Sequence, residues 1–156
     1  MYNSEIKELA KQAEVYSSMM ARSSEMTTCP FCTMPSERIL ASGKLAFVVM
    51  DGFPISPGHT LIIPYRHVQS WFQTTPEERI EMLELMDAQK VELDRKRKPD
   101  SYNIGINDGP AAGQTVAHLH MHLIPRFQGD VSDPRGGVRW VIPEKAVYWT
   151  KSALSH

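Results

Sequence analysis

The residues best suited to chemistry are three histidines that alternate with large apolar residues, His118, His120 and His122. Successive side chains of a strand point to opposite faces, so the pattern predicts a buried strand with the three imidazoles on one face. Neighbouring imidazoles would then lie about 6.6 Å apart, within reach of one phosphate group. A lone histidine on a half-buried strand is usually a hydrogen-bonded core residue. Because a row of three is costly to desolvate and to charge, we predict that a ligand or a metal uses it.

A second group that could do chemistry is the pair Cys29 and Cys32, the only cysteines of the chain. Two intervening residues are typical of a redox motif or of half of a zinc site, and the spacing alone leaves both open. No thioredoxin-like βαβ pattern follows the pair. Two cysteines at this spacing suit a reduced protein better than a disulfide framework.

Length and charge limit the classes of partner. The 156 residues are 42% hydrophobic, which favours one folded domain. Lysine plus arginine (17) nearly balances aspartate plus glutamate (18), so we expect neither a nucleic-acid polymer nor an anionic membrane as partner. The sequence shows no apolar run near the ~20 residues that span a bilayer and no signal-peptide pattern at Met1, so we expect a cytoplasmic protein.

The apolar periodicity and the turn residues predict the elements that position these groups. We expect an amphipathic helix over 3–21, a hairpin of strands 39–41 and 45–50, a strand over 59–64, a helix capped by Thr75 and running toward Pro99, a strand over 102–107 and a surface loop over 129–137. The strand over 102–107 should pair antiparallel with the histidine strand, through a small-residue loop at 108–115. The positive residues at the end of the long helix, 95–98, complement the helix dipole, and we assign them no function.

The run from Asn107 to Arg126 resembles the histidine triad (HIT) family of nucleotide hydrolases and transferases. The resemblance extends to Ala46-Phe47-Val48 and Pro57-Gly58-His59 and covers roughly residues 29–128. It implies an α+β, HIT-like fold: an antiparallel sheet with one main helix packed on it, here with an extra N-terminal helix, assembled as a homodimer. We expect a single domain over 1–156, with a helical extension at 1–25, a core at 29–128 and a C-terminal loop and tail at 129–156. Unassigned apolar residues such as Trp140 and Trp149 would pack across the two-fold axis.

The resemblance makes His120 the nucleophile that attacks the α-phosphate and forms a nucleotidyl-imidazole intermediate, which water then hydrolyses. A neutral imidazole offers one ring nitrogen to phosphorus only if an acceptor, such as a backbone carbonyl, holds its other N–H. His122 would help the leaving group depart. Gln114 and the backbone amides around Gly113 and Thr115 would supply donors where negative charge accumulates.

For the rest of the substrate, Asn107 would contact phosphate or the leaving group, and Asp51 would accept both ribose hydroxyls. Without the family match, Asp51 is a turn-forming aspartate before Gly52. Phe47 and Ile55 would flank the base. Two arginines, Arg135 and Arg139, would either contact a polyphosphate tail or belong to a solvated basic loop.

A histidine in the third triad position is typical of the hydrolases, whereas the phosphorylase and uridylyltransferase relatives carry glutamine there. We therefore expect an enzyme of the dinucleoside polyphosphate hydrolase branch, acting on diadenosine tetra- or triphosphate. The alternatives are an adenosine phosphoramidase and a non-catalytic nucleotide-binding module. By resemblance to zinc-bearing members, Cys29, Cys32, His67 and His118 would hold a structural zinc ion. Magnesium would accompany the substrate.

Overall fold

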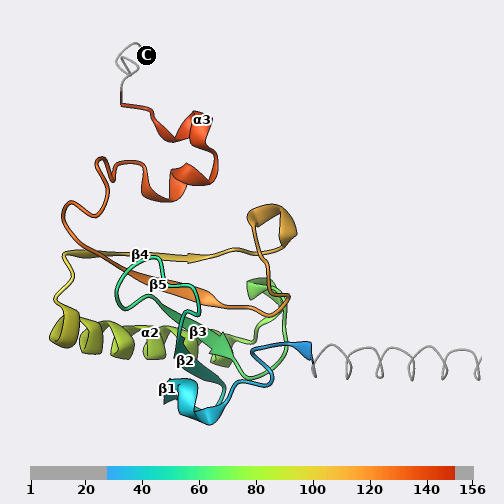
Figure 1. Cartoon of the computed structure of the whole chain (residues 1–156). Helices are drawn as coiled ribbons and strands as arrows, with labels where there is room; N and C mark the ends of the chain where they lie inside the picture. The colour runs from blue at the N-terminus through green and yellow to red at the C-terminus, as the bar shows by residue number, and fades with distance from the viewer. Residues whose placement is uncertain (1–27, 150–156) are drawn as a thin grey trace, which may run out of the picture.

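A five-stranded antiparallel sheet with one long helix on it forms the body of the protein in a computed structural model, which describes residues 28–149 (Figure 1). The strand order is β1-β2-β3-β5-β4. In chain order the elements are η1 (Ser36–Arg38), β1 (Ile39–Ser42), β2 (Ala46–Met50), β3 (Thr60–Pro64), η2 (Trp71–Gln73), α2 (Pro76–Arg97), β4 (Ser101–Ile106), η3 (Pro110–Ala112), β5 (Met121–Arg126), η4 (Gly137–Val141) and α3 (Pro143–Ala146). The expected α+β architecture is confirmed. The helix expected over 3–21 lies outside the described residues.

The first two strands form the expected hairpin, and α2 fixes its turn. Glu81 on the helix accepts hydrogen bonds from the backbone N–H groups of Leu45 and Ala46, at 2.6 and 2.9 Å. An ideal Cβ atom at Gly43 would lie 2.2 Å from the same carboxylate. The glycine in this turn therefore makes room for the helix side chain that holds the hairpin.

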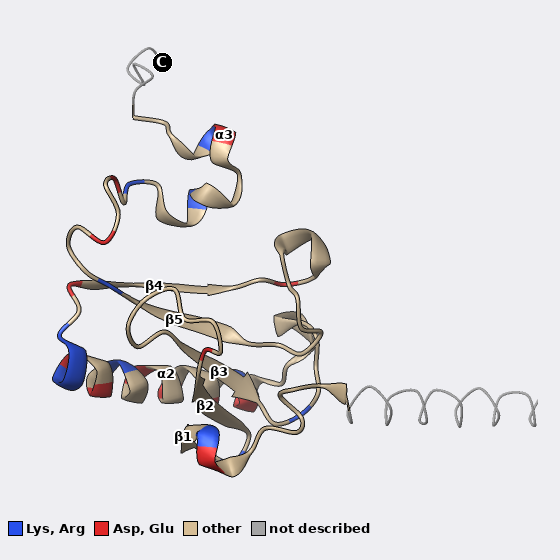
Figure 2. Cartoon of the chain, in the orientation of Figure 1, with Lys and Arg blue, Asp and Glu red and all other residues tan. Residues whose placement is uncertain are grey.

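The long helix begins and ends at the residues that carry the sequence signals. The hydroxyl of Thr75 accepts from the backbone N–H of Glu78, and the Glu78 carboxylate accepts from the backbone N–H of Thr75. Pro76 occupies the first helical position. At the other end Lys98 adopts a left-handed conformation with φ of 50°, and the positive residues of the last turn gather there (Figure 2).

The two faces of the sheet have different roles. Facing α2, alternate strand residues such as Val48, Ile62 and Leu123 pack with Met82 and Leu93 of the helix into the main hydrophobic core. The opposite face carries a smaller buried cluster of Phe47, Val49, Leu61 and Ile63. Beside this cluster, alternate residues of β5 place His122, Ile124 and Arg126 on the same face. Within 28–149 no helix comparable to α2 covers this second face. Phe31, Met34 and Ile39 pack against its buried cluster, and a cavity lies over the rest of the face.

The prediction that one strand carries all three histidines was wrong in part, because β5 begins only at Met121. The backbone just before it is held elsewhere: the N–H of Leu119 donates to the carbonyl of Val68 at 2.6 Å, outside the sheet ladder. Pairing with β3 starts where Met121 meets Ile62. The His120 and His122 rings nevertheless lie 5.1 Å apart, centre to centre.

Beyond β5 the chain leaves the sheet as a segment of residues 129–149, which holds η4 and α3 (Figure 1). Its ring stacking is local: Arg135 lies over the Trp149 ring at 4.4 Å and Arg139 over the Tyr148 ring at 4.9 Å. Among the described helices none combines the length and the apolar character needed to cross a bilayer.

Candidate active site and metal centre

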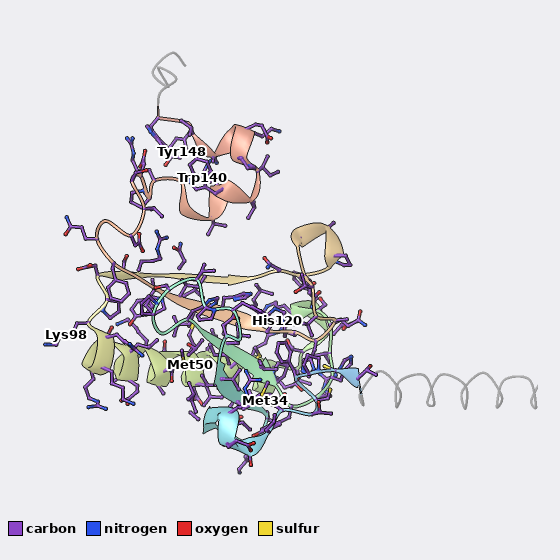
Figure 3. The ribbon with its side chains drawn as sticks, in the orientation of Figure 1. Met34, Met50, Lys98, His120, Trp140 and Tyr148 are labelled. Atoms are coloured by element: carbon purple, nitrogen blue, oxygen red, sulfur yellow. The ribbon has the colours of Figure 1, made fainter. Side chains whose placement is uncertain are left out.

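His120 lies at the entry of β5 (Figure 3). One of its ring nitrogens is occupied by a hydrogen bond and the other is available. Its Nδ1–H donates to the backbone carbonyl of His118 at 2.8 Å, which leaves the lone pair on Nε2. The side chain is nearly buried, and the ring of Phe31 contacts it edge-on at 5.2 Å. His120 also lines the large cavity of the open sheet face. A buried imidazole whose Nδ1 is held by a carbonyl and whose Nε2 is free at a cavity has the arrangement that a nucleophile needs.

His122 is oriented by His59, which begins the run into β3. The backbone N–H of Ile55 donates to Nδ1 of His59 at 3.4 Å, so the proton of His59 is on Nε2. That Nε2–H donates to Nδ1 of His122 at 2.9 Å. The proton of His122 must then be on its own Nε2. This relay makes His122 a hydrogen-bond donor and complements the acceptor state of His120.

The environment keeps both histidines of the relay uncharged at neutral pH. Burial lowers the pKa of His122 to about 4, assisted by the neighbouring His120 and His59 and opposed by Asp51. Burial also lowers the pKa of His59, against the attraction of Asp51. An uncharged pair retains the order of donors and acceptors described above.

Asp51 follows β2 and contacts both histidines of the relay. Its Oδ2 lies 3.3 Å from Nε2 of His59 and 3.8 Å from Nδ1 of His122, and its Oδ1 accepts from the backbone N–H of Phe53 at 2.8 Å. The bond to Phe53 is the turn interaction typical of an aspartate before a glycine. Asp51 also lines the cavity, so contact with a ribose stays a prediction.

A cavity of about 1180 Å³ extends over the open face of the sheet. Among the expected substrate-binding residues it is lined by Asp51, Ile55, Asn107 and Thr115. Phe47 does not line it, because that side chain is 1% exposed and packs with Val49, Leu61 and Ile63. Neighbouring Val49 and Leu61 line the cavity instead, together with Phe31 and Met34.

Gln114 and Gly113 do not line the cavity, and Gln114 serves its own loop. Its Oε1 accepts from the backbone N–H of Gly109 and its Nε2 donates to the carbonyl of Gln69, both at 2.8 Å. In this structure the expected donor to the oxyanion is therefore already engaged. Asp108 adds a second tether, since its Oδ2 accepts from the backbone N–H of Trp71 at 2.9 Å and from the hydroxyl of Ser70 at 3.1 Å.

The two arginines of the C-terminal segment bind partners within that segment. Arg135 forms an ion pair with Asp133 at 2.8 Å, and Arg139 donates to the carbonyl of Lys145 at 2.7 Å. Neither arginine lines the cavity.

The four residues expected to bind zinc come together. Each offers one ligand atom, and Cys29, Cys32, His67 and His118 place these atoms within 4.8 Å of one another. Sγ of Cys29 and of Cys32 lie 3.4 and 3.5 Å from Nδ1 of His118, and Sγ of Cys32 lies 3.1 Å from Nδ1 of His67. A tetrahedral zinc ion with typical bond lengths would separate such sulfur and nitrogen atoms by about 3.6 Å.

The protonation pattern also fits a metal. Nε2–H of His118 donates to the carbonyl of Pro64 at 2.8 Å, which leaves Nδ1 for the ion. Burial and the adjacent Cys29 raise the pKa of Cys32 to about 11 without a cation, and a divalent ion would offset this cost. The donor set therefore fits zinc, and four protein ligands would leave no position open for catalysis.

A second cluster, Asp51, His59 and His122, is also close enough to hold an ion. A metal on Nε2 of His59 would require the proton on Nδ1, where the N–H of Ile55 already donates. We therefore interpret this cluster as a hydrogen-bond relay.

The sequence analysis gave His59 no role, although a signal was present. His59 precedes the apolar run of β3 by the even spacing that places it on the face of Leu61 and Ile63. Phe31, between the two cysteines, was missed as well. It lies against His120 and against His118, whose ring centre is 5.7 Å away.

The comparisons with known proteins assign the family. Residues 34–129 match the family model described as the HIT domain. The chain belongs to the HIT family. An AP-4-A phosphorylase from Mycobacterium tuberculosis is 34% identical over 95 residues, which cover 60% of this chain and 49% of that protein. A bis(5'-nucleosyl)-tetraphosphatase [asymmetrical] from Schizosaccharomyces pombe is 38% identical over 90 residues, which cover 58% of this chain and 50% of that protein. This HIT chain thus spans about half the length of these two curated relatives.

Among solved structures, a Zn-bound histidine triad family protein from Mycobacterium smegmatis is similar to this HIT chain with a TM-score of 0.62 and 30% identity. The match covers 78% of this chain and 95% of that one. A HIT family protein from Bacillus anthracis matches with a TM-score of 0.62 and 30% identity, over 66% of this chain and 76% of that one. These neighbours confirm the expected HIT fold.

Proposed function

We propose that this protein is a nucleotide hydrolase that cleaves dinucleoside polyphosphates at the α-phosphate through a nucleotidyl-His120 intermediate. The observation that carries the proposal is the complementary pair of tautomers at the cavity: a free Nε2 lone pair on His120 and an Nε2–H on His122. A nucleophile and a donor side by side are the two groups that a displacement at phosphorus needs.

In the first step Nε2 of His120 forms a bond to the α-phosphorus, and the bond from that phosphorus to the bridging oxygen breaks. The electron pair leaves with the bridging oxygen, toward which His122 donates its Nε2–H. The His118 carbonyl, at 2.8 Å from Nδ1, stabilises the positive charge that develops on His120. In the second step a water oxygen forms a bond to the phosphorus and the bond from phosphorus to Nε2 of His120 breaks, with its electron pair returning to the imidazole. The proton of the water is lost to solvent, and the mononucleotide leaves.

We also propose that a structural zinc ion is held by Cys29, Cys32, His67 and His118. The ion would fix the loop that carries the two cysteines to the backbone at His118. The support is the donor geometry and the Zn-bound relative. His118 would then link the two sites, because its ring binds the ion while its carbonyl orients His120. Magnesium has no support among the described residues and is not proposed. The homodimer stays a prediction, since the structure describes one chain.

The substrate class is supported by relatives named bis(5'-nucleosyl)-tetraphosphatase [asymmetrical] and bis(5'-adenosyl)-triphosphatase. Because another relative is named a phosphorylase, the test must separate hydrolysis from phosphorolysis. The full chain should be incubated with diadenosine tetraphosphate or adenosine phosphoramidate, with and without inorganic phosphate, and the products separated by anion exchange.

We expect mononucleotide to be released whether or not phosphate is added. His120→Asn should abolish this release without unfolding the protein. Products that require phosphate would indicate transfer, and preference for the phosphoramidate would favour the phosphoramidase. Tight nucleotide binding without turnover of any substrate would favour the non-catalytic module.

A further inference from the structure

The cavity is larger than one nucleotide needs. Its volume of about 1180 Å³ exceeds the 300–1,000 Å³ typical of pockets for drug-sized ligands, a size class that includes a nucleoside monophosphate. One continuous cavity connects apolar residues at two opposite ends, with the histidines between them. A second base-sized group would therefore find room without a separate site.

The strand order places these regions in sequence across the sheet. At the β2–β3 end the cavity is lined by Met34, Val49 and Leu61, and in the middle by His122 of β5. Beyond β5 lies the edge strand β4, about 14 Å from β2 at the usual strand spacing. The far end is lined by the C-terminal segment, through Val138, Trp140 and Val141. In the orientation of Figure 1, Figure 3 shows β4 between the segment with Trp140 and the side of the molecule that carries Met50 and Met34.

Trp140 has the features of a stacking platform. Its indole Nε1–H donates to the carbonyl of Arg135 at 2.9 Å, which fixes the ring, while 45% of the residue stays exposed. The flanking Val138 and Val141 are exposed by 69% and 76%, so the apolar surface faces the cavity without a partner within 28–149. A fixed, exposed indole stacks on any base because every base has an aromatic face.

We propose that Trp140, with Val138 and Val141, binds the second nucleoside of a dinucleoside polyphosphate, the one that leaves with the distal phosphates. This inference rests on the proposed function and names the residues that select a substrate with two nucleosides. For Trp140, which lines the cavity, it replaces the expectation of packing across a two-fold axis. The first nucleoside lies at the β2–β3 end, the α-phosphorus at His120, and the polyphosphate chain crosses β4.

The test measures binding apart from turnover. In the full chain carrying His120→Asn, the dissociation constants of diadenosine tetraphosphate and adenosine tetraphosphate are compared by calorimetry. The two ligands have the same number of phosphates and differ in the second nucleoside. Trp140→Ala should raise the dissociation constant of the dinucleoside compound by roughly 5- to 150-fold, the range of base–aromatic stacking, and leave that of adenosine tetraphosphate unchanged.

Two matched variants separate stacking from loss of structure. Trp140→Phe retains an aromatic face and should restore most of the affinity. Trp149→Ala removes an indole of the same segment that does not line the cavity, and should leave both constants unchanged. The inference is overturned if Trp140→Ala weakens both ligands equally or neither, or if Trp149→Ala has the same effect. Turnover is measured separately in the wild-type protein. If Trp140→Ala selectively weakens dinucleoside binding and the wild-type protein turns over no substrate, the proposed hydrolysis is rejected and the inference about Trp140 stands.

Discussion

Replacement of His59 tests the relay that makes His122 a donor. His59 is 3% exposed, and its Nε2 lies 2.9 Å from Nδ1 of His122. In His59→Leu this hydrogen bond is lost, so Nδ1 of His122 is left without its donor and either ring nitrogen can hold the proton. In His59→Gln the side-chain amide nitrogen is as many bonds from Cβ as Nε2 of histidine and can still donate.

A buried acceptor that loses its donor costs about 1–3 kcal/mol. If that cost falls on the transition state, in which His122 must donate, kcat should fall roughly 5- to 150-fold. KM should change less than kcat, because the hydrogen bond from His122 to the leaving oxygen is needed in the transition state. His59→Gln should keep most of the wild-type kcat.

The assay is steady-state release of mononucleotide from diadenosine tetraphosphate by the three proteins, with thermal unfolding as the control for folding. Equal losses in both variants would show that His59 contributes only packing. An unimpaired His59→Leu would refute the assignment of His122 as the donor.

Three further predictions concern the metal, acid stability and the loop before β3. Zinc bound to the purified protein should be one ion per chain by elemental analysis and fall toward none in Cys29→Ser, with a lower unfolding temperature; unchanged zinc content would contradict the ligand set. Because the pKa of His122 is about 4 in the fold against about 6.5 in an unfolded chain, the unfolded state binds the proton more readily, so stability should fall between pH 6.5 and 4 by up to about 3 kcal/mol. Urea unfolding at several pH values measures this loss of stability, and the loss should be smaller in His122→Gln. If the stability of the variant and of the wild-type protein depends on pH in the same way, His122 is not the source of the loss. Gly58→Ala should destabilise the protein by roughly 2–4 kcal/mol, because φ is +93° and the new Cβ would lie 2.7 Å from Leu93. Gly129→Ala, where φ is also positive but the space is open, should cost only about 1–2 kcal/mol. Equal losses of stability in the two variants would contradict the clash with Leu93.

Much of the fold could be predicted because its signals are local. The cap at Thr75 and Pro76, the apolar runs of β2 and β3 and the glycine turn at Gly43 each determine a short stretch of backbone, and the structure has these elements where they were expected. The start of β5 could not be predicted in this way. It depends on the bond from Leu119 to the carbonyl of Val68, which is far away in the sequence.

The candidate site shows the same division. A backbone carbonyl was expected to accept the hydrogen bond from Nδ1 of His120. The structure identifies it as the carbonyl of His118, two positions away. Phe47 was expected at the base and Gln114 at the phosphate, but the pleat of β2 turns Phe47 into the buried cluster and the Gln114 amide holds its own loop. The even spacing before Leu61 indicates only the face of the sheet on which His59 lies. The contact with His122 joins residues 63 positions apart and depends on the pairing of β3 with β5, which the sequence does not give.

The most direct test of the account is detection of the bond between His120 and the nucleotide. The full chain is mixed with diadenosine tetraphosphate, quenched in alkali within one turnover and digested, and the peptides are weighed by mass spectrometry. We predict one adenylylated peptide, with the modification on His120 and absent from His120→Asn. Undiminished turnover in wild-type protein with no adenylylated histidine at any time, or with the label on another residue, would contradict the proposed mechanism.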